Sequence, residues 1–543
     1  MPTTLTLTRV GVAYGARPLV HGLDLAIGDG SVTAVVGANG SGKSTLMRAI
    51  VGDLPLEAGS VRLAPADATI GWLPQELPEP TETLLEHARR RTGVAAADLA
   101  LQAAAEALAA GSPGAAEHYS AKLEAWLSCG AADLEERIPF AAAQVGLDVD
   151  TDRRLGTLSG GQVARVGLVV ILLSRYDVLL LDEPTNNLDA RGLALMTDFV
   201  RGHDGPVLIA SHDRGFLDAV ATDVVELDLA QQRVGHHHGT YADYVAARAL
   251  ARRQAHRAFE EYAGHRDALI AQARQRDGWA AKGQRTVARG EEPDKHLRER
   301  DKARADRQAG KAARLKRAAV RLPEVEQPRK EWQLRYAIDA GPASTELVAT
   351  LSGALVQRPA FRLGPLDLSL ERGDRVAVSG DNGSGKSTLL AALLGDLPLT
   401  EGRQSLGARV RVGVLDQQRG LLESDATVVD ILRHLLGDPH PAEVRTLLAK
   451  FGLGAEHVDR PARSLSLGER TRALMALFQA RAVNLLVLDE PTNHLDVAAI
   501  EQLESALADY TGTLVVVSHD VAFLEAVGVD RRWHVDDGQV SET

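Results

Sequence analysis

The sequence GANGSGKST at residues 37–45 follows the apolar run VTAVV, and it recurs as GDNGSGKST at 380–388 after RVAVS. The pattern GxxxxGK[ST] between a strand and a helix is typical of a phosphate-binding loop, whose glycines let backbone N–H groups turn toward phosphate oxygens. One such match could arise by chance. Two matches that each follow an apolar strand favour two phosphate-binding domains of the α/β class.

Three further motifs repeat in the same order along the chain. They are LSGGQ (158–162) with LSLGE (465–469), LLLDEPTNNLD (179–189) with LVLDEPTNHLD (486–496), and ASHD (210–213) with VSHD (517–520). Equivalent residues are 343 positions apart for Lys43 and Lys386, but only 307 apart for Ser159 and Ser466. The first copy of the repeat is therefore about 36 residues longer than the second.

The extra residues lie between Gln75 and Ser159, because Gln75 and Gln417 are still 342 positions apart. This stretch contains AAADLALQAAAEALAA at 95–110, whose residues favour helix, and we predict a short helical insertion at about 78–125. Elsewhere apolar strands alternate with helical segments, which predicts a mostly parallel sheet in each copy. The predicted domains are 1–240, a linker at 241–335, and 336–543.

The linker has the opposite charge balance to the rest of the chain. Residues 241–335 carry 24 Lys and Arg against 14 Asp and Glu, whereas the whole chain has a net charge of −12. A basic segment in an acidic protein is typical of a contact with a polyanion, and the alternative is a solvated charged coiled coil. Small and apolar residues at a three-to-four spacing predict two antiparallel helices, at about 244–277 and 294–322.

Glycines and Pro293 place the tip of this hairpin at about 278–293. Arginine and lysine suit phosphate, and tryptophan can stack on a base. The candidate RNA contacts at the tip are Trp279, Lys282, Arg285 and Arg289.

Each copy also ends an apolar strand with Asp-Glu, at the edge where ligands bind in open parallel sheets. We expect Asp182 and Asp489 to hold Mg²⁺ through water, and the following glutamates to orient and deprotonate an attacking water. A histidine after the next apolar strand, in Ser-His-Asp, can reach the same phosphate. The candidate catalytic residues are Glu183, Glu490, His212 and His519.

With the LSGGQ motif added, the chain resembles the ABC ATPase superfamily over about 1–240 and 336–543. The resemblance implies that two domains meet head to tail, so that the signature of each closes on the ATP held by the other. It implies Mg²⁺ ligands at Ser44, Gln75, Asp182, Ser387, Gln417 and Asp489. One site would comprise Tyr14, Gly37, Asn39, Gly40, Ser41, Gly42, Lys43, Ser44, Thr45, Gln75 and Asp182, with Ser466, Gly468 and Glu469. The other would comprise Gly380, Asn382, Gly383, Ser384, Gly385, Lys386, Ser387, Thr388, Gln417 and Asp489, with Ser159, Gly160, Gly161 and Gln162.

Two positions depart from the superfamily pattern. Leu467 stands where the second signature should have glycine, which puts the shape of the site containing Lys43 in doubt. Tyr14 is placed to stack on adenine in the first site, but its equivalent by alignment is Gln357. Phe361 is close to Gln357 but out of register, so the second site is expected to hold its base by other apolar contacts.

Two ABC domains in one chain, an insertion before the first signature and a long charged linker together resemble the ABC-F family. The linker entry GTYADYVAAR (239–248) also resembles that of the ABC-F family, and the second signature, SLGER, is similar to that of actinobacterial antibiotic-resistance members. The resemblance implies a monomer whose two ATPase domains pair within the chain and bind the ribosome near the tRNA exit site. The linker would contact rRNA and peptidyl-tRNA at the peptidyl-transferase region and confer resistance to ribosome-targeting antibiotics.

Three alternatives stay open. A general translation factor of the same family would bind the ribosome without countering a drug. The cytosolic ATPase subunit of a drug exporter would need a separate membrane partner and would give the basic linker no role. A DNA-maintenance ATPase ranks last, because such proteins carry their coiled coils inside the ATPase domain.

Composition narrows the setting. Cys129 is the only cysteine, no charged and apolar leader precedes the first strand, and no apolar run approaches the ~18 residues of a membrane span, which together predict a cytoplasmic protein. The run His236–His238 suggests a metal tract. Because three consecutive histidines cannot all face one ion from a strand, we interpret the run as a surface loop without metal.

Overall fold

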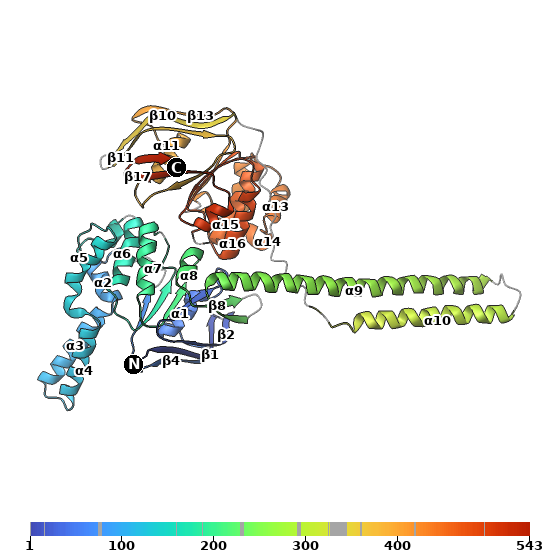
Figure 1. The fold of residues 1–543 in the computed structure, drawn as a ribbon, viewed down its shortest axis with the longest axis horizontal. Helices are drawn as coiled ribbons and strands as arrows, with labels where there is room; N and C mark the ends of the chain where they lie inside the picture. Colours follow the sequence, from blue (N-terminus) through green and yellow to red (C-terminus); the bar gives the residue numbers. More distant parts are fainter. Residues whose placement is uncertain are drawn as a thin grey trace. The chain divides into compact units, whose positions relative to one another are not determined.

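A computed structural model of the chain describes residues 2–15, 17–73, 79–158, 160–186, 188–228, 233–289, 295–323, 325, 345–358, 361–416, 420–493 and 495–542. It forms two compact units. The first comprises Met1–Tyr241 together with Gln333–Thr543, and the second comprises Ala242–Trp332. Both copies of the repeat lie in the first unit, and the linker helices make up the second (Figure 1).

The first copy is organised around a six-stranded sheet with strand order β5-β6-β7-β3-β8-β9. Its neighbouring strands run parallel, except that β9 pairs antiparallel with β8 at the edge. Strands β3, β6 and β7 are buried along their whole length, as expected for a sheet covered on both faces. The bounds are β5 Ile70–Leu73, β6 Val178–Asp182, β7 Val207–Ala210, β3 Val32–Val36, β8 Asp223–Asp228 and β9 Arg233–His238.

The second copy repeats this sheet with the order β14-β15-β16-β12-β17-β18, again with one antiparallel edge strand. The predicted α/β class, with two tandem domains and a long helix between them, is therefore confirmed. The bounds are β14 Val412–Leu415, β15 Leu485–Asp489, β16 Thr513–Val517, β12 Arg375–Ser379, β17 Arg531–Asp536 and β18 Gln539–Glu542.

A three-stranded antiparallel sheet accompanies each large sheet. In the first copy its order is β2-β1-β4, and in the second it is β11-β10-β13. Leucines and valines of β1 pack with those of the central strands into one core, and β10 does the same in the second copy. The bounds are β1 Thr4–Tyr14, β2 Arg17–Ile27, β4 Ala58–Ala64, β10 Leu347–Arg358, β11 Phe361–Glu371 and β13 Glu401–Leu406.

The helices that carry the motifs begin at the carboxyl ends of the central strands. Helix α1 follows β3, and α11 follows β12, so each phosphate-binding loop joins the middle strand of its sheet to a helix. The helices of the first copy are α1 Lys43–Val51, α2 Leu84–Arg91, α3 Val94–Ala109, α4 Ala115–Ser128, α5 Leu134–Gln144, α6 Gly160–Leu173, α7 Ala190–Arg201 and α8 Arg214–Val220. Those of the second are α11 Lys386–Leu394, α12 Val428–Leu435, α13 Pro441–Lys450, α14 Ala455–Val458, α15 Leu467–Ala480, α16 Val497–Ala508 and α17 Val521–Ala526. Short 3₁₀ turns occur at Ala131–Asp133, Leu155–Thr157, Gly420–Leu422 and Ala462–Ser464.

The insertion of the first copy begins later than the predicted 78–125. Helix α2 has a counterpart in α12, because both are capped by a threonine, Thr83 or Thr427, that forms a bridge to the segment before the signature. Among the described elements the additional helices are α3 and α4, which together cover 94–128. Alanine content predicts that a segment is helical, but it does not show whether that helix has a counterpart in the second copy. The predicted insertion therefore began too early, at 78. Trp126 of α4 donates a hydrogen bond to Asp98 of α3 at 2.6 Å and joins the two helices.

The histidines His236–His238 lie in strand β9, so their interpretation as a surface loop is wrong. Histidine has little strand propensity of its own, and pairing with β8 imposes the extended conformation.

The linker unit consists of two long helices, α9 (Tyr241–Arg289) and α10 (Lys295–Val320), which Figure 1 shows side by side. Alanines seven residues apart are buried on each helix, Ala273 and Ala280 on α9 and Ala312 and Ala319 on α10. Asp277 of α9 forms an ion pair with Lys316 of α10 at 2.7 Å. The seam is narrow, so most of the charged side chains that the structure describes on these helices stay exposed.

The tip predicted at 278–293 is too long, because α9 continues through Gly278 and Gly283 to Arg289. A single glycine costs a helix only about 1 kcal/mol, and the flanking alanine, lysine, glutamine and arginine residues favour helix. Trp279, Lys282, Arg285 and Arg289 therefore belong to the last turns of α9, and the side chain of Arg289 lies outside the described part. Within the described residues, none of the helices combines the length and apolar character needed to cross a bilayer.

Replacing Gly278 by alanine tests this correction. Open space surrounds the Cα of Gly278, so the added methyl group should stabilise α9 locally by about 1 kcal/mol. Amide hydrogen exchange of peptides from 270–289 should slow about fivefold. Gly264→Ala, at a similarly open site earlier in the same helix, is the matched control. A slowing in the control without any slowing at Gly278 would place 278 outside the helix.

Candidate nucleotide sites

Each phosphate-binding loop is closed by its own lysine. Lys43 Nζ donates a hydrogen bond to the Gly37 carbonyl at 3.0 Å, and Lys386 Nζ donates to the Gly380 carbonyl at 2.7 Å. Burial lowers the pKa of both lysines, and the nearby carboxylates oppose that effect. Gly42, at φ +101°, occupies the N-cap of α1 in the left-handed region. A residue with a Cβ would be strained there, which explains the glycine.

The loops fit the phosphates of a nucleotide. Ser41 Oγ and Ser384 Oγ are buried and lack a hydrogen-bond partner among the residues that the structure describes. Both lie just before the N-terminus of a nine-residue helix, where backbone N–H groups and the helix dipole favour an anion. Unpaired buried donors beside an ammonium group match the oxygens of a polyphosphate.

A carboxylate and a hydroxyl meet beside each loop. Ser387 Oγ donates to Asp489 Oδ2 at 3.3 Å, and Ser44 forms the corresponding hydrogen bond with Asp182. Burial raises the pKa of both aspartates. Asp182 Oδ1 is buried without a partner within the described residues. These are oxygen donors of the type that Mg²⁺ prefers, so the pair fits a magnesium ion bound with the phosphates.

The next residue in each copy, Glu183 or Glu490, has a left-handed backbone with φ of 52° or 47°. Such a conformation costs a non-glycine residue of order 1–3 kcal/mol and is found mainly at functional sites. Backbone hydrogen bonds hold it, from Glu183 N to the Ala210 carbonyl at 2.7 Å and from Glu490 N to the Val517 carbonyl at 2.9 Å. The two copies therefore aim their glutamates in the same way.

Both glutamates are desolvated and face a histidine. Burial raises the pKa of Glu183 to about 8 and that of Glu490 to about 7. His212 Nε2 lies 3.1 Å from Glu183 Oε1, and His519 Nε2 lies 3.6 Å from Glu490 Oε1. Burial lowers the pKa of His519. A carboxyl group with a pKa near neutrality beside an imidazole is suited to general acid–base chemistry.

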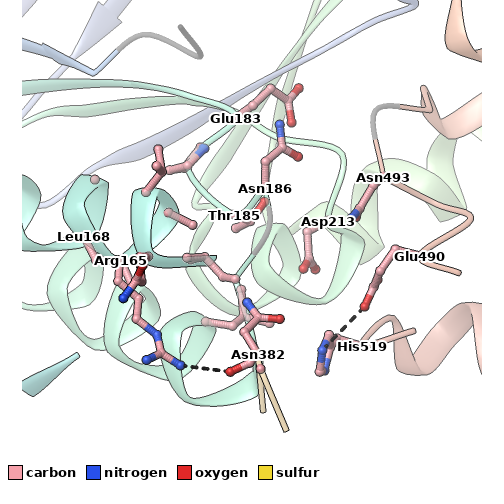
Figure 2. A pocket seen from close by; sticks show the side chains of 18 of the residues that line it. Arg165, Leu168, Glu183, Thr185, Asn186, Asp213, Asn382, Glu490, Asn493 and His519 are labelled. Carbon is pink, nitrogen blue, oxygen red and sulfur yellow. Dashed lines mark hydrogen bonds and ion pairs between the residues drawn. The ribbon is translucent and has the colours of Figure 1, made fainter. Parts of the chain in front are cut away.

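One cavity of about 1490 Å³ is lined by motif residues from both copies. Lys386, Glu490 and His519 of the second copy share it with residues 162–165, 167 and 168 of α6, the first signature helix. Figure 2 shows Glu490 and His519 turned toward each other and Arg165 extended toward Asn382. Asp182 and Glu183 of the first copy line the same cavity, together with Leu467 of the second signature.

Two reciprocal hydrogen bonds join the copies. Asp189 Oδ2 accepts from the backbone N–H of Asn382 in the second loop at 3.2 Å, and Asp496 Oδ2 accepts from that of Asn39 in the first loop at 3.0 Å. The other oxygen of each aspartate caps its own helix, Asp189 on α7 and Asp496 on α16. The second loop, which shares the cavity with the first signature helix, is therefore held by Asp189 of the first copy, and the first loop is held by Asp496 of the second copy.

Sequence reasoning missed Arg165 and Leu19, and it set Phe361 aside as out of register. Arg165 follows the first signature by one helical turn and lies 3.4 Å from Asp189, a position that helical periodicity signals. Phe361 packs on the second phosphate loop, since a Cβ on Gly385 would come within 2.4 Å of its ring. In the first copy Leu19, which is out of register with Phe361, occupies the corresponding place, because a Cβ on Gly42 would come within 3.0 Å of its side chain. Phe361 lies four positions after Gln357, the residue aligned with Tyr14, so that alignment did not single it out.

One ion pair between the copies involves a residue that the repeat does not conserve in its second copy. Arg214 of α8 pairs with Glu504 of α16 and lies 3.8 Å from Asp520. The position equivalent to Arg214 is Val521, so this contact is made on one side only.

Several predicted residues are described only in part. Gln75, Gln417 and Ser159 lie outside the described residues, as does the side chain of Tyr14. Gly160 and Gly161 begin α6. In the second signature, Ser466 caps α15 and Glu469 turns back to the Ser466 N–H at 2.8 Å, forming a capping box. Glu469 Oε2 also accepts from Arg460 at 2.6 Å, so this carboxylate serves its own helix end.

Two tandem parallel sheets, each with a glycine-rich loop, a paired carboxylate and a signature helix, define an ABC-type ATPase. The ABC transporter family model matches residues 20–186 and 363–493. The tylosin resistance ATP-binding protein of Streptomyces fradiae is 33% identical over 540 residues, covering 95% of this chain and 94% of that protein. ABC transporter F family member 4 of Arabidopsis thaliana is 30% identical, covering 99% of this chain and 74% of that protein. The chain belongs to the ABC-F family.

Solved structures agree on the fold. An archaeal ribosome recycling factor, crystallised with a ribosomal stalk protein, aligns with a TM-score of 0.55 over 98% of this chain and 89% of that chain. RNase-L inhibitor aligns with a TM-score of 0.54 over the same shares. Sequence identity to both is 17%, so the likeness shows the tandem architecture alone.

The raised pKa of Glu183 predicts a pH-dependent effect of Glu183→Gln. A carboxyl group that binds its proton more tightly when folded destabilises the fold as pH rises from its unfolded pKa toward about 8. Without nucleotide, the glutamine variant should therefore match the wild type near pH 5. By about pH 9 it should be more stable, by on the order of a few kcal/mol.

Thermal unfolding followed across this pH range, in chelator, measures the difference. Glu57→Gln removes an exposed carboxylate and should leave the pH profile close to wild type. A constant offset between wild type and Glu183→Gln at all pH values would contradict the buried, protonated glutamate.

Proposed function

We propose that this ABC-F protein hydrolyses ATP at both sites and binds the ribosome through its basic linker. The observation that carries the hydrolytic part is the repeated Asp-Glu pair, with a strained, desolvated glutamate facing a histidine beside each phosphate loop. The observation that carries the ribosomal part is the charge of the linker, which has an excess of about ten positive residues in an acidic protein.

In each site the chain supplies the groups that hold and orient the substrate. Lys43 or Lys386 and the loop amides bind the terminal phosphates of ATP, and the signature of the opposite copy closes on them. Ser44 with Asp182, and Ser387 with Asp489, together with Gln75 and Gln417, hold Mg²⁺, which neutralises charge that develops on the phosphates.

The buried glutamate takes a proton from the attacking water, and the histidine positions the γ-phosphate beside it. Glu183 and Glu490 are assigned this role, with His212 and His519 as their partners. A base with a pKa near neutrality accepts a proton and returns it without a large energetic cost. The fixed backbone of each glutamate keeps its carboxylate at the edge of the sheet where phosphate binds.

The linker is proposed to contact rRNA and peptidyl-tRNA near the tRNA exit site. Trp279 is 53% exposed on α9, and Lys282 and Arg285 are exposed near the end of the same helix. A planar aromatic ring beside two cations is suited to a nucleic-acid strand. Similarity to a tylosin resistance protein over nearly the whole chain supports a role in antibiotic resistance for a cytoplasmic, monomeric protein.

A general translation factor is the second candidate. ATP-binding protein Uup of Escherichia coli, whose name specifies no drug, is 31% identical over 95% of this chain and 77% of that protein. Growth with and without the gene, across a panel of ribosome-targeting antibiotics, separates the two roles. An exporter ATPase is less favoured, because it leaves the basic linker without a role.

Blocking hydrolysis should trap the protein on ribosomes. The double variant Glu183→Gln/Glu490→Gln keeps the binding residues but removes both bases, so with ATP it should sediment with ribosomes far more than the wild type. Sedimentation through a sucrose cushion measures this, and the same variant with ADP is the control. If the trapped protein stays in the supernatant while ATP binding is intact, the ribosomal proposal is wrong.

Reversing charge on the linker should weaken that association without touching hydrolysis. Lys282→Glu/Arg285→Glu should make affinity less dependent on salt. The steepness of the fall of log affinity with log salt should decrease by about two, because each substitution removes one cation from a phosphate. ATPase activity without ribosomes should be unchanged. Arg62→Glu/Arg403→Glu, which reverses two exposed charges on strands of the ATPase domains, is the matched control. Equal effects of both pairs would contradict a linker-specific interaction.

A further inference from the structure

The strand pair β8–β9 gathers three potential metal ligands at the edge of the first sheet. Asp223 of β8 is paired with His238 of β9, and Val225 is paired with His236. Because side chains alternate along a strand, His236 and His238 share one face, and His237 belongs to the other. The objection that three consecutive histidines cannot face one ion is correct, but two alternate ones can.

The three ligand groups already converge. His238 Nδ1 lies 2.6 Å from Asp223 Oδ1, and His236 Nε2 lies 3.6 Å from the same oxygen. The imidazole rings are 4.4 Å apart between centroids. One ligand atom from each of the three residues lies within 4.8 Å of the others. Tetrahedral zinc holds its ligands at about 2.1 Å, hence about 3.4 Å from one another, which small rotations here would reach.

The surroundings favour such a rotation and fix the carboxylate. The His238 side chain is 81% exposed, so its ring can turn at little cost. Asp223 is more buried, and its Oδ2 accepts a hydrogen bond from Thr222 Oγ1 at 3.0 Å. Thr222 Oγ1 in turn accepts from the Val32 N–H of β3 at 3.0 Å. A carboxylate oriented by a neighbouring hydroxyl is the arrangement found behind metal ligands.

The second copy provides an internal comparison. Its strands β17 and β18 pair in the same register, but Arg531 replaces Asp223 and Glu542 replaces His236. Arg531 and Glu542 form an ion pair at 2.6 Å. This edge of the sheet is therefore closed by a salt bridge in one copy and by an aspartate with two histidines in the other. Of these two donor sets, only the aspartate with two histidines in the first copy suits a transition metal.

We propose that Asp223, His236 and His238 bind one divalent transition-metal cation of the zinc class, with water completing the coordination. Two imidazoles and a carboxylate are the donors that zinc accepts, whereas calcium and magnesium require oxygen ligands. The cation replaces the hydrogen bond between His238 and Asp223 and links the edge strand β9 to β8. His238 precedes the first residue of α9, Tyr241, by three positions, so the site lies where the chain enters the linker.

The experiment uses the full chain, stripped with chelator and free of nucleotide, with Zn²⁺ as the probe. Equilibrium dialysis should find one site that both His236→Ala and His238→Ala weaken by at least about tenfold. His237→Ala removes the neighbouring histidine of the opposite face and should keep wild-type affinity. Co²⁺ in place of Zn²⁺ should give the visible absorption of a four-coordinate site in the wild type and in His237→Ala only.

Two results would overturn the proposal. One is zinc affinity that none of the three histidine substitutions changes, which would assign the bound metal to carboxylates elsewhere. The other is an equal loss in all three variants, which would indicate a nonspecific histidine tract. Thermal unfolding in chelator should be alike for all variants, and this readout separates loss of metal from loss of fold.

Discussion

The hydrogen bonds of Asp189 and Asp496 are the constraint on which the rest of the assembly depends. Each aspartate caps a helix of its own copy and accepts the loop N–H of Asn382 or Asn39 in the other copy. Because one carboxylate serves both purposes, neither loop can shift without disturbing a helix end in the opposite domain. Charge-assisted bonds to backbone N–H groups are among the stronger hydrogen bonds in proteins. The second phosphate loop lines one cavity with the first signature helix, and Asp189 ties that loop to the first copy.

The two sites are nonetheless unequal, and the differences lie outside the catalytic groups. The glutamates repeat with matching left-handed backbones, and burial raises the pKa of both glutamates and lowers that of both loop lysines. Around them Phe361 replaces Leu19 at the loop, Leu467 replaces glycine in a signature, and the Arg214–Glu504 pair has no mirror image. Chemistry constrains the first group on both sides. The surrounding residues are constrained only by packing and by contacts between the copies, so these residues can differ between the two sites.

Motif spacing was enough to predict the repeated α/β fold, because phosphate loops and Asp-Glu pairs require fixed positions on a sheet. It was not enough to predict the limits of the insertion or of the linker tip. The topological role of the capping threonine of α2 depends on context that propensity does not contain, and one glycine in α9 costs too little to outweigh the helix-forming residues around it. Phe361 escaped for a related reason, since its place at Gly385 follows from the packing of β11 and not from its distance to the motif. His236 escaped because its partners became visible only when the strand pairing was known.

In the linker, a narrow apolar seam between α9 and α10 leaves most of the helix surface to charged residues. Among the described residues the buried positions along the seam between α9 and α10 are alanines, and burying one methyl group contributes on the order of 1 kcal/mol, so the seam gains little from apolar burial. Wider apolar residues would strengthen the pair but would occupy surface that now carries arginine and lysine. A thin alanine seam lets two helices approach closely and leaves nearly all of the circumference to charge. The same choice makes ion pairs such as Asp277–Lys316 relatively more important for holding the helices in register, and these pairs are the ones that added salt or a competing polyanion would loosen.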